Sequence, residues 1–544
     1  MLRYALRSHL AGIIGYSAFF GGYAVIEVGT FQRLNQGSAQ TGAVFQIVSA
    51  QMSYMDRPVA DLNLLGGYIE WFLLGFFPLF FGLWAAVAGT GALRGEDERG
   101  LIEHWLAAGV RPAQLVFTRL AGFVLALLLV MAAVVLIGGG LAALTGQSLT
   151  VRGLLLQSLA EAAPAPALFA GAMVFGRLLP TRRNALGVFG IVLVAMYFVN
   201  GFSRTVDWLK PWAWLTPFAY ADHSDALLPG GGLNLLDFAV PLVAAVLLAG
   251  LAAWMLGARD LGSAFVRLGG ENRPPVRGVR RTGWAAIPTL VALWDQRLGL
   301  SVWMLGIFAY ALSTVGLTKG FVHGTELAAG SLGGLQMKVA FGLDGADPAA
   351  GFIGLEWFRV ACLILAAYAI VQVARWAAED AEGRLEMMLA AGLPRWRVIV
   401  DRGLTLIAAG LLLATANLAA VWLGTRAAGI DLRVDRLLLA SALLLPVLAA
   451  FGAAGAALAA WRPRVATYAL GAVVVLGYFV PLMAVPIFNS PTPPDWFLDL
   501  SVFRLYGNPL NEGVFWNGLY LQVGILAAGF AVAIAAMRRR EVGR

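Results

Sequence analysis

Two acidic segments of the chain repeat one pattern, and their residue types suit contact with a basic protein surface. The segment EDERGLIEHWLAAG begins at Glu96, and the segment EDAEGRLEMMLAAG begins at Glu379. Extended to residues 96–119 and 379–402, the two align without gaps and share nine of 24 residues. Each begins with clustered carboxylates and continues with apolar residues at helical spacing. The repeat therefore predicts two short amphipathic helices with acidic N-terminal ends.

An amphipathic helix of this kind can lie on lipid or dock against another protein. The cytoplasmic leaflet is anionic and repels acidic clusters, so a basic groove on a second polypeptide suits these carboxylates better. A helix lying on lipid stays the alternative. The residues expected to make the protein contact are Glu96, Asp97, Glu98, Gly100, Glu103 and Leu106 in the first copy, and Glu379, Asp380, Glu382, Gly383, Glu386 and Leu389 in the second.

The sequence has no motif for phosphate binding or catalysis. A phosphate-binding loop needs a lysine directly after a glycine, because backbone amides and that lysine together hold the phosphates. The three lysines, Lys210, Lys319 and Lys338, follow a leucine, a threonine and a methionine. The four histidines are scattered and the one cysteine, Cys362, lies in an apolar run. We therefore expect no enzyme activity, no disulfide, no metal and no cofactor bound by this chain.

The amino-acid composition indicates the class of protein to which these two loops belong. Of 544 residues, 60% are hydrophobic and 13% are charged, whereas soluble domains are about 45–50% apolar and about 25% charged. A soluble enzyme is therefore excluded, and no polar domain is left that could bind nucleic acid. Each membrane crossing takes about 20 apolar residues. The chain is long enough for about a dozen crossings of a lipid bilayer.

Hydropathy and helix-breaking residues predict an all-α polytopic membrane protein with twelve transmembrane helices. The first six are expected near residues 10–29, 67–91, 115–144, 153–178, 184–202 and 235–257. The second six are expected near residues 298–318, 351–374, 403–424, 437–460, 465–486 and 518–536. They form two six-helix halves, residues 1–257 and 298–544. A Gly-, Pro- and Arg-rich cytoplasmic linker at 258–297 joins them.

The distribution of basic residues predicts the orientation. With both termini in the cytoplasm, the inner segments hold 27 of the 39 lysine and arginine residues, in agreement with the positive-inside rule. The two acidic loops then occupy equivalent cytoplasmic positions, between the second and third helix of each half. Because both halves cross the membrane in the same direction, they are predicted to be parallel repeats.

With these loops in these positions, the chain resembles the membrane subunits of type-2 ABC exporters. In that family a Glu-rich Gly-x-x-Glu-x-x-Leu segment forms the coupling helix that docks into the ATPase subunit. The fused twelve-helix form resembles the tetronasin-resistance type of antibiotic exporter permease. The sequence departs from the family pattern after the glycine, where it has Leu101 and Arg384 instead of threonine, and at the helix end, where it has Gly109 and Gly392 instead of Thr-Pro.

The resemblance implies a multi-pass permease subunit of an ATP-driven exporter in the bacterial plasma (inner) membrane. It implies a separate ABC ATPase, in two copies per permease chain, which binds the ATP and Mg. The implied cargo is a lipophilic antibiotic, drug or ionophore. An ion-coupled secondary transporter stays the alternative, because that class also has twelve helices in two parallel halves.

The resemblance also implies elements beyond the crossings. An elbow helix is expected at residues 2–10, with a copy at 287–299, and partly re-entrant outer hairpins are expected at 206–228 and 494–510. An interfacial belt of aromatic residues is the other interpretation of these hairpins.

Cargo contacts are predicted at large aromatic residues. The triplet Glu-Trp-Phe occurs at Glu70 and again at Glu356, at the expected outer ends of helices two and eight. These glutamates are expected either to face each other across the outer mouth of the path or to cap their own helices. The full predicted path, for which packing against lipid or other helices is the alternative, comprises Glu70, Phe77, Phe81, Trp84, Tyr197, Phe198, Glu356, Trp357, Phe358, Tyr478 and Phe479.

One further acid, Glu161, is expected to be the only one deep within a helix. A proton-coupled carrier would use such a residue, because a charged acid at the membrane centre costs about 2.5–3.5 kcal/mol. A protonated or water-contacting glutamate is the other interpretation.

Overall fold

The computed structural model of this chain is helical, with no strand in the parts that it describes. These parts are residues 1–34, 49, 57–204, 206–258, 287–327, 338, 342–343, 345, 347–381, 383–390, 392–488 and 493–539. Most of the predicted linker at 258–297 therefore lies outside the described residues. The chain divides into two compact units, residues 1–277 and 278–544.

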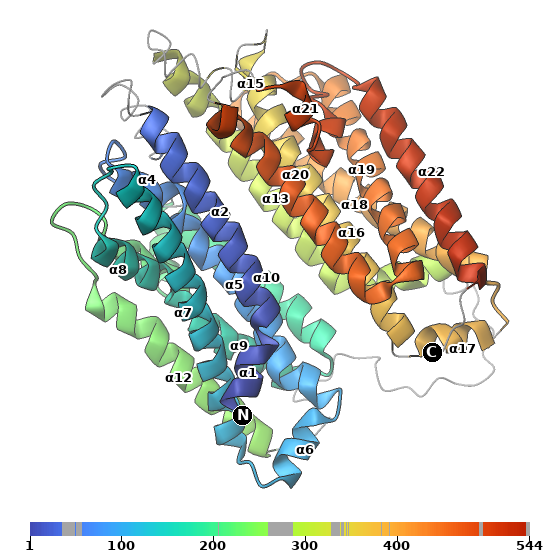
Figure 1. The fold of residues 1–544 in the computed structure, drawn as a ribbon, viewed down its shortest axis with the longest axis horizontal. Helices are drawn as coiled ribbons and strands as arrows, with labels where there is room; N and C mark the ends of the chain where they lie inside the picture. The colour runs from blue at the N-terminus through green and yellow to red at the C-terminus, as the bar shows by residue number, and fades with distance from the viewer. Residues whose placement is uncertain are drawn as a thin grey trace. The chain divides into compact units, whose positions relative to one another are not determined.

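The first unit is a bundle of long helices with short helices at both ends (Figure 1). Its first half consists of α1 (Leu2–Ser8), α2 (Leu10–Leu34), α4 (Leu65–Phe72), the 3-10 turn η1 (Leu74–Phe76), α5 (Phe77–Thr90), the π-helix η2 (Gly91–Gly95) and α6 (Leu101–Ala107). Its second half consists of α7 (Pro112–Leu144), α8 (Val151–Ala162), α9 (Pro164–Leu178), α10 (Arg182–Ser203), η3 (Asp207–Leu209), α11 (Lys210–Ala213), η4 (Pro217–His223) and α12 (Leu235–Ala258).

The second unit has a similar succession of elements. It begins with α13 (Pro288–Leu327), α15 (Pro348–Phe352), the π-helix η6 (Ile353–Trp357), α16 (Phe358–Ala381) and α17 (Arg384–Ala390). It continues with α18 (Arg395–Ala428), α19 (Val434–Trp461), α20 (Pro463–Phe488), α21 (Asp495–Leu498), η7 (Val502–Tyr506) and α22 (Trp516–Arg539).

The lengths of these helices fit a polytopic membrane protein. Among the described residues, 11 helical segments are long and apolar enough to cross a bilayer. A shorter apolar segment, Val465–Pro481, lies in α20, where the eleventh crossing is predicted. The all-α membrane fold expected from hydropathy is confirmed.

Two predicted elements differ from those observed. The fourth crossing is two helices, α8 and α9, which meet at Ala163 because Pro164 has no backbone N–H to continue the α8 ladder. The elbow of the first unit is the separate helix α1, which ends at His9. The predicted second elbow at 287–299 is wrong as a separate element, because α13 runs without a break for 40 residues.

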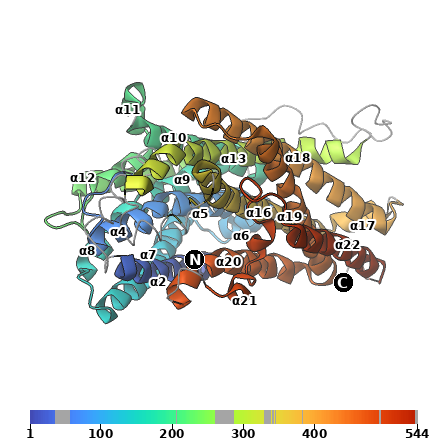
Figure 2. The same cartoon turned by 90° about the horizontal axis from the view of Figure 1, so that it is seen from above.

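The predicted outer hairpins form short helices joined by turns. In Figure 2, α11 projects from the edge of the first unit. Trp208, Trp212 and Trp214 on this segment are exposed, as expected of side chains at a membrane–water interface. In the second unit, the corresponding segment is α21 and η7, and Trp496 is likewise exposed.

Small residues bring α1 and α7 into close contact at the end of the first unit that carries α6. A Cβ atom placed on Gly122 of α7 would lie 2.6 Å from the Cβ atom of Ala5. Only glycine permits this approach without displacement of α1. The start of α7 and the short helix α1 thus form one support for the neighbouring loop.

The orientation can be tested at the two ends of α7. This helix has 33 residues and is about 50 Å long, so its ends lie on opposite sides of a hydrocarbon core of about 30 Å. An impermeant thiol reagent added outside intact cells should label the Ser148→Cys variant and should label Ala113→Cys only after permeabilisation. Cys362 is buried and should give little background. The opposite labelling pattern would contradict cytoplasmic termini.

Candidate functional site

The two acidic segments form loops whose glycines, in the described residues, have matching backbone angles. We call residues 96–109 the first loop and residues 379–392 the second loop. The first loop holds α6 between Gly100 (φ 70°) and Gly109 (φ 82°). In the second loop, α17 lies between Gly383 (φ 72°) and Gly392 (φ 83°). These four glycines have left-handed backbone angles that other residues rarely adopt, which accounts for their place in the repeated pattern.

Each loop is closed by an ion pair between its first acid and the following long helix. Arg119 Nη2 of α7 donates to Glu96 Oε2 at 2.7 Å. Arg402 Nη2 of α18 donates to Glu379 Oε2 at 2.8 Å. These residues are the first and last identities of the aligned segments, so the repeat preserves the closure itself.

The two ion pairs differ in burial. The side chains of Arg119 and Glu96 are 2% and 5% exposed, whereas those of Arg402 and Glu379 are 15% and 22% exposed. Arg119 also lies 4.7 Å from the ring centre of Tyr4 in α1. Burial raises the pKa of Glu96, although the charge of Arg119 opposes this shift. The first closure is therefore a buried charge pair, and the second is partly hydrated.

Asp97 ties the first loop to a second element of the unit. Its Oδ2 accepts from Arg94 Nη1 at 3.0 Å and from Arg177 Nη1 of α9 at 3.1 Å. In the second copy, Ala377 stands two residues before the acidic segment, at the position that corresponds to Arg94. The contact of Arg94 with this aspartate therefore has no arginine at the corresponding position of the second unit.

The acids of the first loop therefore do not form one exposed surface. Glu96 and Asp97 are buried and are used in ion pairs within the unit, which contradicts the expectation that they face a partner. Glu98 accepts from the backbone N–H of Arg182 at 2.7 Å but stays exposed, as does Glu103. The acids that this loop exposes are therefore Glu98 and Glu103, with Arg99 and His104 exposed beside them.

The second loop is described in part. Glu386 is exposed, while Leu389 is half-buried like Leu106 of the first loop. Leu385 is buried, as is Ile102 at the aligned position, so each short helix is held by one apolar side chain. Glu382 and the side chain of Asp380 lie outside the described residues.

A buried histidine marks the junction of α1 and α2 beside the first loop. His9 packs edge-on against Trp84, Phe123 and Phe169, with ring centres 5.6–6.1 Å apart. Burial lowers the pKa of His9 to about 4, and the nearby charge of Arg119 adds to the shift. The ring is therefore neutral at physiological pH and supports the loop through packing.

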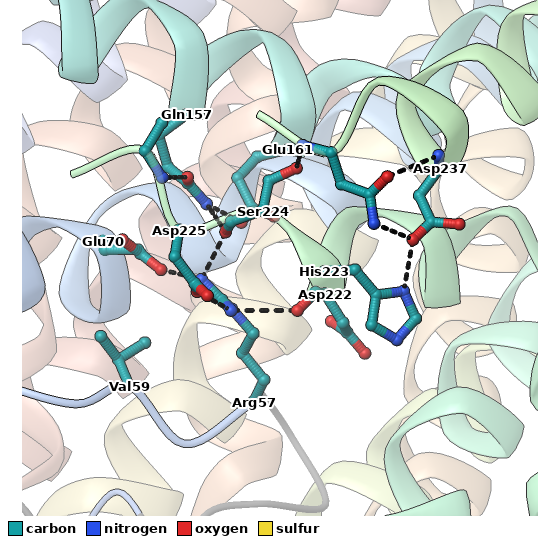
Figure 3. Close-up of polar contacts among 12 residues, drawn as sticks. Arg57, Val59, Glu70, Gln157, Glu161, Asp222, His223, Ser224, Asp225 and Asp237 are labelled. Carbon is teal, nitrogen blue, oxygen red and sulfur yellow. Dashed lines mark hydrogen bonds and ion pairs between the residues drawn. The ribbon is translucent and has the colours of Figure 1, made fainter. Parts of the chain in front are cut away.

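At the opposite end of the first unit, Arg57 joins three segments (Figure 3). Its guanidinium pairs with Glu70 of α4 and with Asp225. It also donates to the backbone carbonyls of Asp222 at 3.0 Å and Ser224 at 2.7 Å. The segment after η4 is thereby fixed to the start of the second crossing.

Helix capping, one of the two roles predicted for the glutamates of the Glu-Trp-Phe triplets, does not match the geometry of either unit. Glu70 lies in the second turn of α4, and its charge is neutralised by Arg57, so the residue is no cap. In the second unit Asp347 caps α15 by accepting from the N–H of Ala350 at 3.0 Å. Glu356 lies further along the helix, half-buried in η6. Helix capping is thus wrong for both glutamates.

Glu161 is connected, through Gln157, to the segment after η4 that Arg57 also contacts. Gln157 Nε2 donates to Glu161 Oε1 at 3.0 Å and to the carbonyl of Ser224 at 2.9 Å. Gln157 Oε1 accepts from the N–H of Ala226 at 2.9 Å. Figure 3 shows Glu161 beside this network, in which a side-chain amide partners the acid.

The predicted path residues of the first unit are mostly packed inside it. Phe77 and Phe81 are buried against Phe20 of α2, with ring centres 4.7 and 5.4 Å apart. Trp84 is buried and stacks on Tyr16 at 4.9 Å. Packing alone accounts for these three residues. Tyr197 and Phe198 of α10 are half-buried, and Tyr197 contacts Phe218 of the outer segment.

In the second unit the predicted path residues also contact neighbouring helices. Trp357 Nε1 donates to Asn417 Oδ1 of α18 at 2.6 Å. Phe358 stacks on Tyr506 of η7 at 6.1 Å. Tyr478 is half-buried and Phe479 is buried. Cargo contact at any of these positions stays a prediction.

Sequence reasoning did not single out Arg57, Arg177 or Glu27. The prediction that Glu161 is the only acid deep within a helix is wrong, because Glu27 is also buried, within α2. The sequence alone could have indicated a buried acid at this position, because Glu27 lies inside the apolar run AVIEVGTF. Arg57 and Arg177 lie at segment ends, where a charge gives no such signal.

Comparison with known proteins shows that the second unit is similar in sequence to an efflux permease family. Residues 286–538 match the family model described as the C-terminal domain of multidrug efflux system permease Rv1217c. This match covers slightly less than half of the chain. No curated protein matches the chain. Together with the candidate membrane spans, the match supports a transmembrane efflux permease, a transport subunit and not an enzyme.

The two loop-closing ion pairs differ in burial, so their loss should lower the stability of the protein by different amounts. Arg119→Met leaves a buried carboxylate without its partner and should cost about 3–5 kcal/mol. Arg402→Met removes a partly hydrated pair and should cost about 1 kcal/mol. Thermal unfolding of the purified full chain in detergent should show the larger fall in Tm for Arg119→Met. Equal falls in Tm would contradict the difference in burial.

The role of Arg57 can be tested by proteolysis. Arg57→Gln removes the charge that holds Glu70 and Asp225, so the segment after η4 should detach. Limited chymotrypsin digestion should then cleave within residues 222–237 several times faster than in the unchanged chain. Arg204→Gln, which removes a partly exposed partner of Asp222, serves as the control and should have a smaller effect. Equal cleavage in both variants would rule out the proposed role of Arg57.

Proposed function

We propose that this chain is the permease subunit of an ATP-driven ABC exporter, which extrudes lipophilic compounds across a bacterial plasma membrane. The observation that carries the proposal is the duplicated loop. Both units present a seven-residue helix between two left-handed glycines, closed by the same Glu–Arg pair. A structure repeated in this detail suggests a surface that two similar partners bind.

The partner in this proposal is a separate ATPase, one copy at each loop. ATP and Mg are bound by that partner, because this sequence has no phosphate-binding loop. Glu98 and Glu103 give the first loop an exposed acidic surface, and Glu386 gives one to the second loop. A basic groove on the ATPase is the complementary surface.

The ion pairs around the first loop suggest how movement of the ATPase reaches the membrane helices. A force on α6 passes through Glu96 and Arg119 to α7, and through Asp97 and Arg177 to α9. The bond from the N–H of Arg182 to Glu98 adds the start of α10. The second loop is tied to α18 through Arg402. Movement at the loops is therefore delivered to long helices and is not absorbed in flexible backbone.

The proposal is tested by reversing exposed charges and leaving the internal ion pairs intact. Glu103→Lys and Glu386→Lys, at aligned positions, should each reduce co-purification of an untagged ATPase from the native host, and should reduce its drug-stimulated ATP hydrolysis at least several-fold. Glu512→Lys, an exposed acid in another loop, is the matched control and should change neither. Unaltered co-purification in both loop variants would argue against docking at these loops.

The two loops should also contribute unequally. His104 and Trp105 in α6 correspond to Met387 and Met388 in α17, so the docking surfaces differ in shape and polarity. We expect Glu103→Lys and Glu386→Lys to lower ATPase stimulation to different degrees at matched protein levels. Identical losses, in titrations of one ATPase preparation, would show that the surfaces are equivalent.

A further inference from the structure

A buried acid without a basic partner lies near the end of the first unit that carries Arg57. Glu27 of α2 is 7% exposed, and Tyr68 of α4 donates its hydroxyl to Glu27 Oε2 at 2.8 Å. Among the described residues, no lysine, arginine or histidine lies within ion-pair distance of it. Glu70, two residues after Tyr68, is by contrast paired with Arg57. Glu27 is therefore a buried acid that no base among the described residues neutralises.

Aromatic rings surround this carboxyl group. Tyr68 contacts Phe31 and Phe72, with ring centres 5.3 and 4.4 Å apart. Tyr23, one turn before Glu27 on α2, also hydrogen-bonds the carboxyl group. An organic cation is attracted by a carboxylate and by the faces of aromatic rings, so an acid with this many rings in its neighbourhood suits such a ligand.

A strip of half-buried aromatic side chains leads from Glu27 along α2 and α5. Tyr23 contacts Phe76 at 6.1 Å, Phe76 contacts Phe80 at 6.3 Å, and Phe80 contacts Phe19 at 5.4 Å. These four rings, together with Phe72, are called the aromatic strip. Its members are partly exposed, unlike Phe77 and Phe81, which occupy the next helical positions and are fully buried. The accessible aromatic face of the second crossing is therefore one residue away from the predicted one.

We infer that Glu27 and the aromatic strip form a binding site for lipophilic organic cations. The apolar rings accept the hydrocarbon parts of such a compound, and Glu27 supplies the negative charge at the end of the strip. The cost of keeping a carboxylate within a membrane, about 2.5–3.5 kcal/mol, is offset when a cation binds beside it. The site belongs to the first unit only, because α13 has no acid between Asp295 and Glu326.

This inference names a cargo class for the proposed exporter and rests on that proposal for its role in transport, but binding itself needs no ATPase. The test uses the purified full chain in detergent with two ions of nearly equal size and opposite charge, tetraphenylphosphonium and tetraphenylborate. Binding is followed by quenching of tryptophan fluorescence. The unchanged chain should bind the phosphonium at least tenfold more tightly than the borate.

Glu27→Gln keeps the size of the side chain and an acceptor for Tyr68 but removes the charge. It should weaken phosphonium binding by about tenfold and leave borate binding within twofold. Glu326→Gln, an exposed acid near the end of α13, is the matched control and should change neither affinity. Phe76→Ala should weaken both ions, because it shortens the apolar strip and leaves the charge in place.

Three results would overturn the inference: no preference for the phosphonium in the unchanged chain, unchanged phosphonium affinity in Glu27→Gln, or equal loss for both ions in Glu27→Gln. Failure of the proposed function would appear elsewhere, as absence of an associated ATPase with normal phosphonium binding. The two failures are therefore distinguishable.

Discussion

The ion pair between the first acid of each loop and an arginine of the next long helix is the interaction on which the structure of both loops depends. The helices α6 and α17 have only seven residues each, whereas isolated helices need about 12–15 residues even in favourable sequences. They therefore depend on contacts with the rest of the unit, and the ion pair is one of these contacts. The pair joins the first residue of each loop to the long helix that follows the loop. A single buried side chain, Ile102 or Leu385, then orients the short helix. The glycines only make this path sterically possible.

Duplication has preserved that closure while its surroundings have diverged. In the first unit, the pair is buried beneath Tyr4 of α1, and Asp97 adds a second connection to α9. In the second unit, Ala377 stands where the first unit has Arg94, and α13 runs without a break through the position where α1 ends. The first loop is thus held by several buried charged contacts, whereas in the described part of the second loop Glu379 pairs with Arg402 and Arg375 at half-buried positions.

Much of the fold could be predicted from the sequence, because a bilayer requires long apolar segments and the repeat marked the loops. The sequence could not show which acids of the loop are exposed. Glu96 and Asp97 are recognisable as internal only when Arg119 and Arg177, distant in sequence, are seen to contact them. The same limit applies to Glu70, whose partner Arg57 precedes the helix. Hydrophobic periodicity likewise placed Phe77 and Phe81 on one face of the second crossing. It could not show that Phe20 of α2 covers that face, which leaves Phe76 and Phe80 as the more accessible rings.

The π-helices of the second crossing mark a change of register between the copies. The interval from Glu70 to Glu96 is 26 residues, whereas that from Glu356 to Glu379 is 23. Three residues rotate an α-helix by about 300° and lengthen it by about 4.5 Å. The irregular turns η1, η2 and η6 are where such a difference is absorbed. When the loops are superposed, the Glu-Trp-Phe triplets are therefore out of register by three residues, so one superposition cannot match both ends of this crossing.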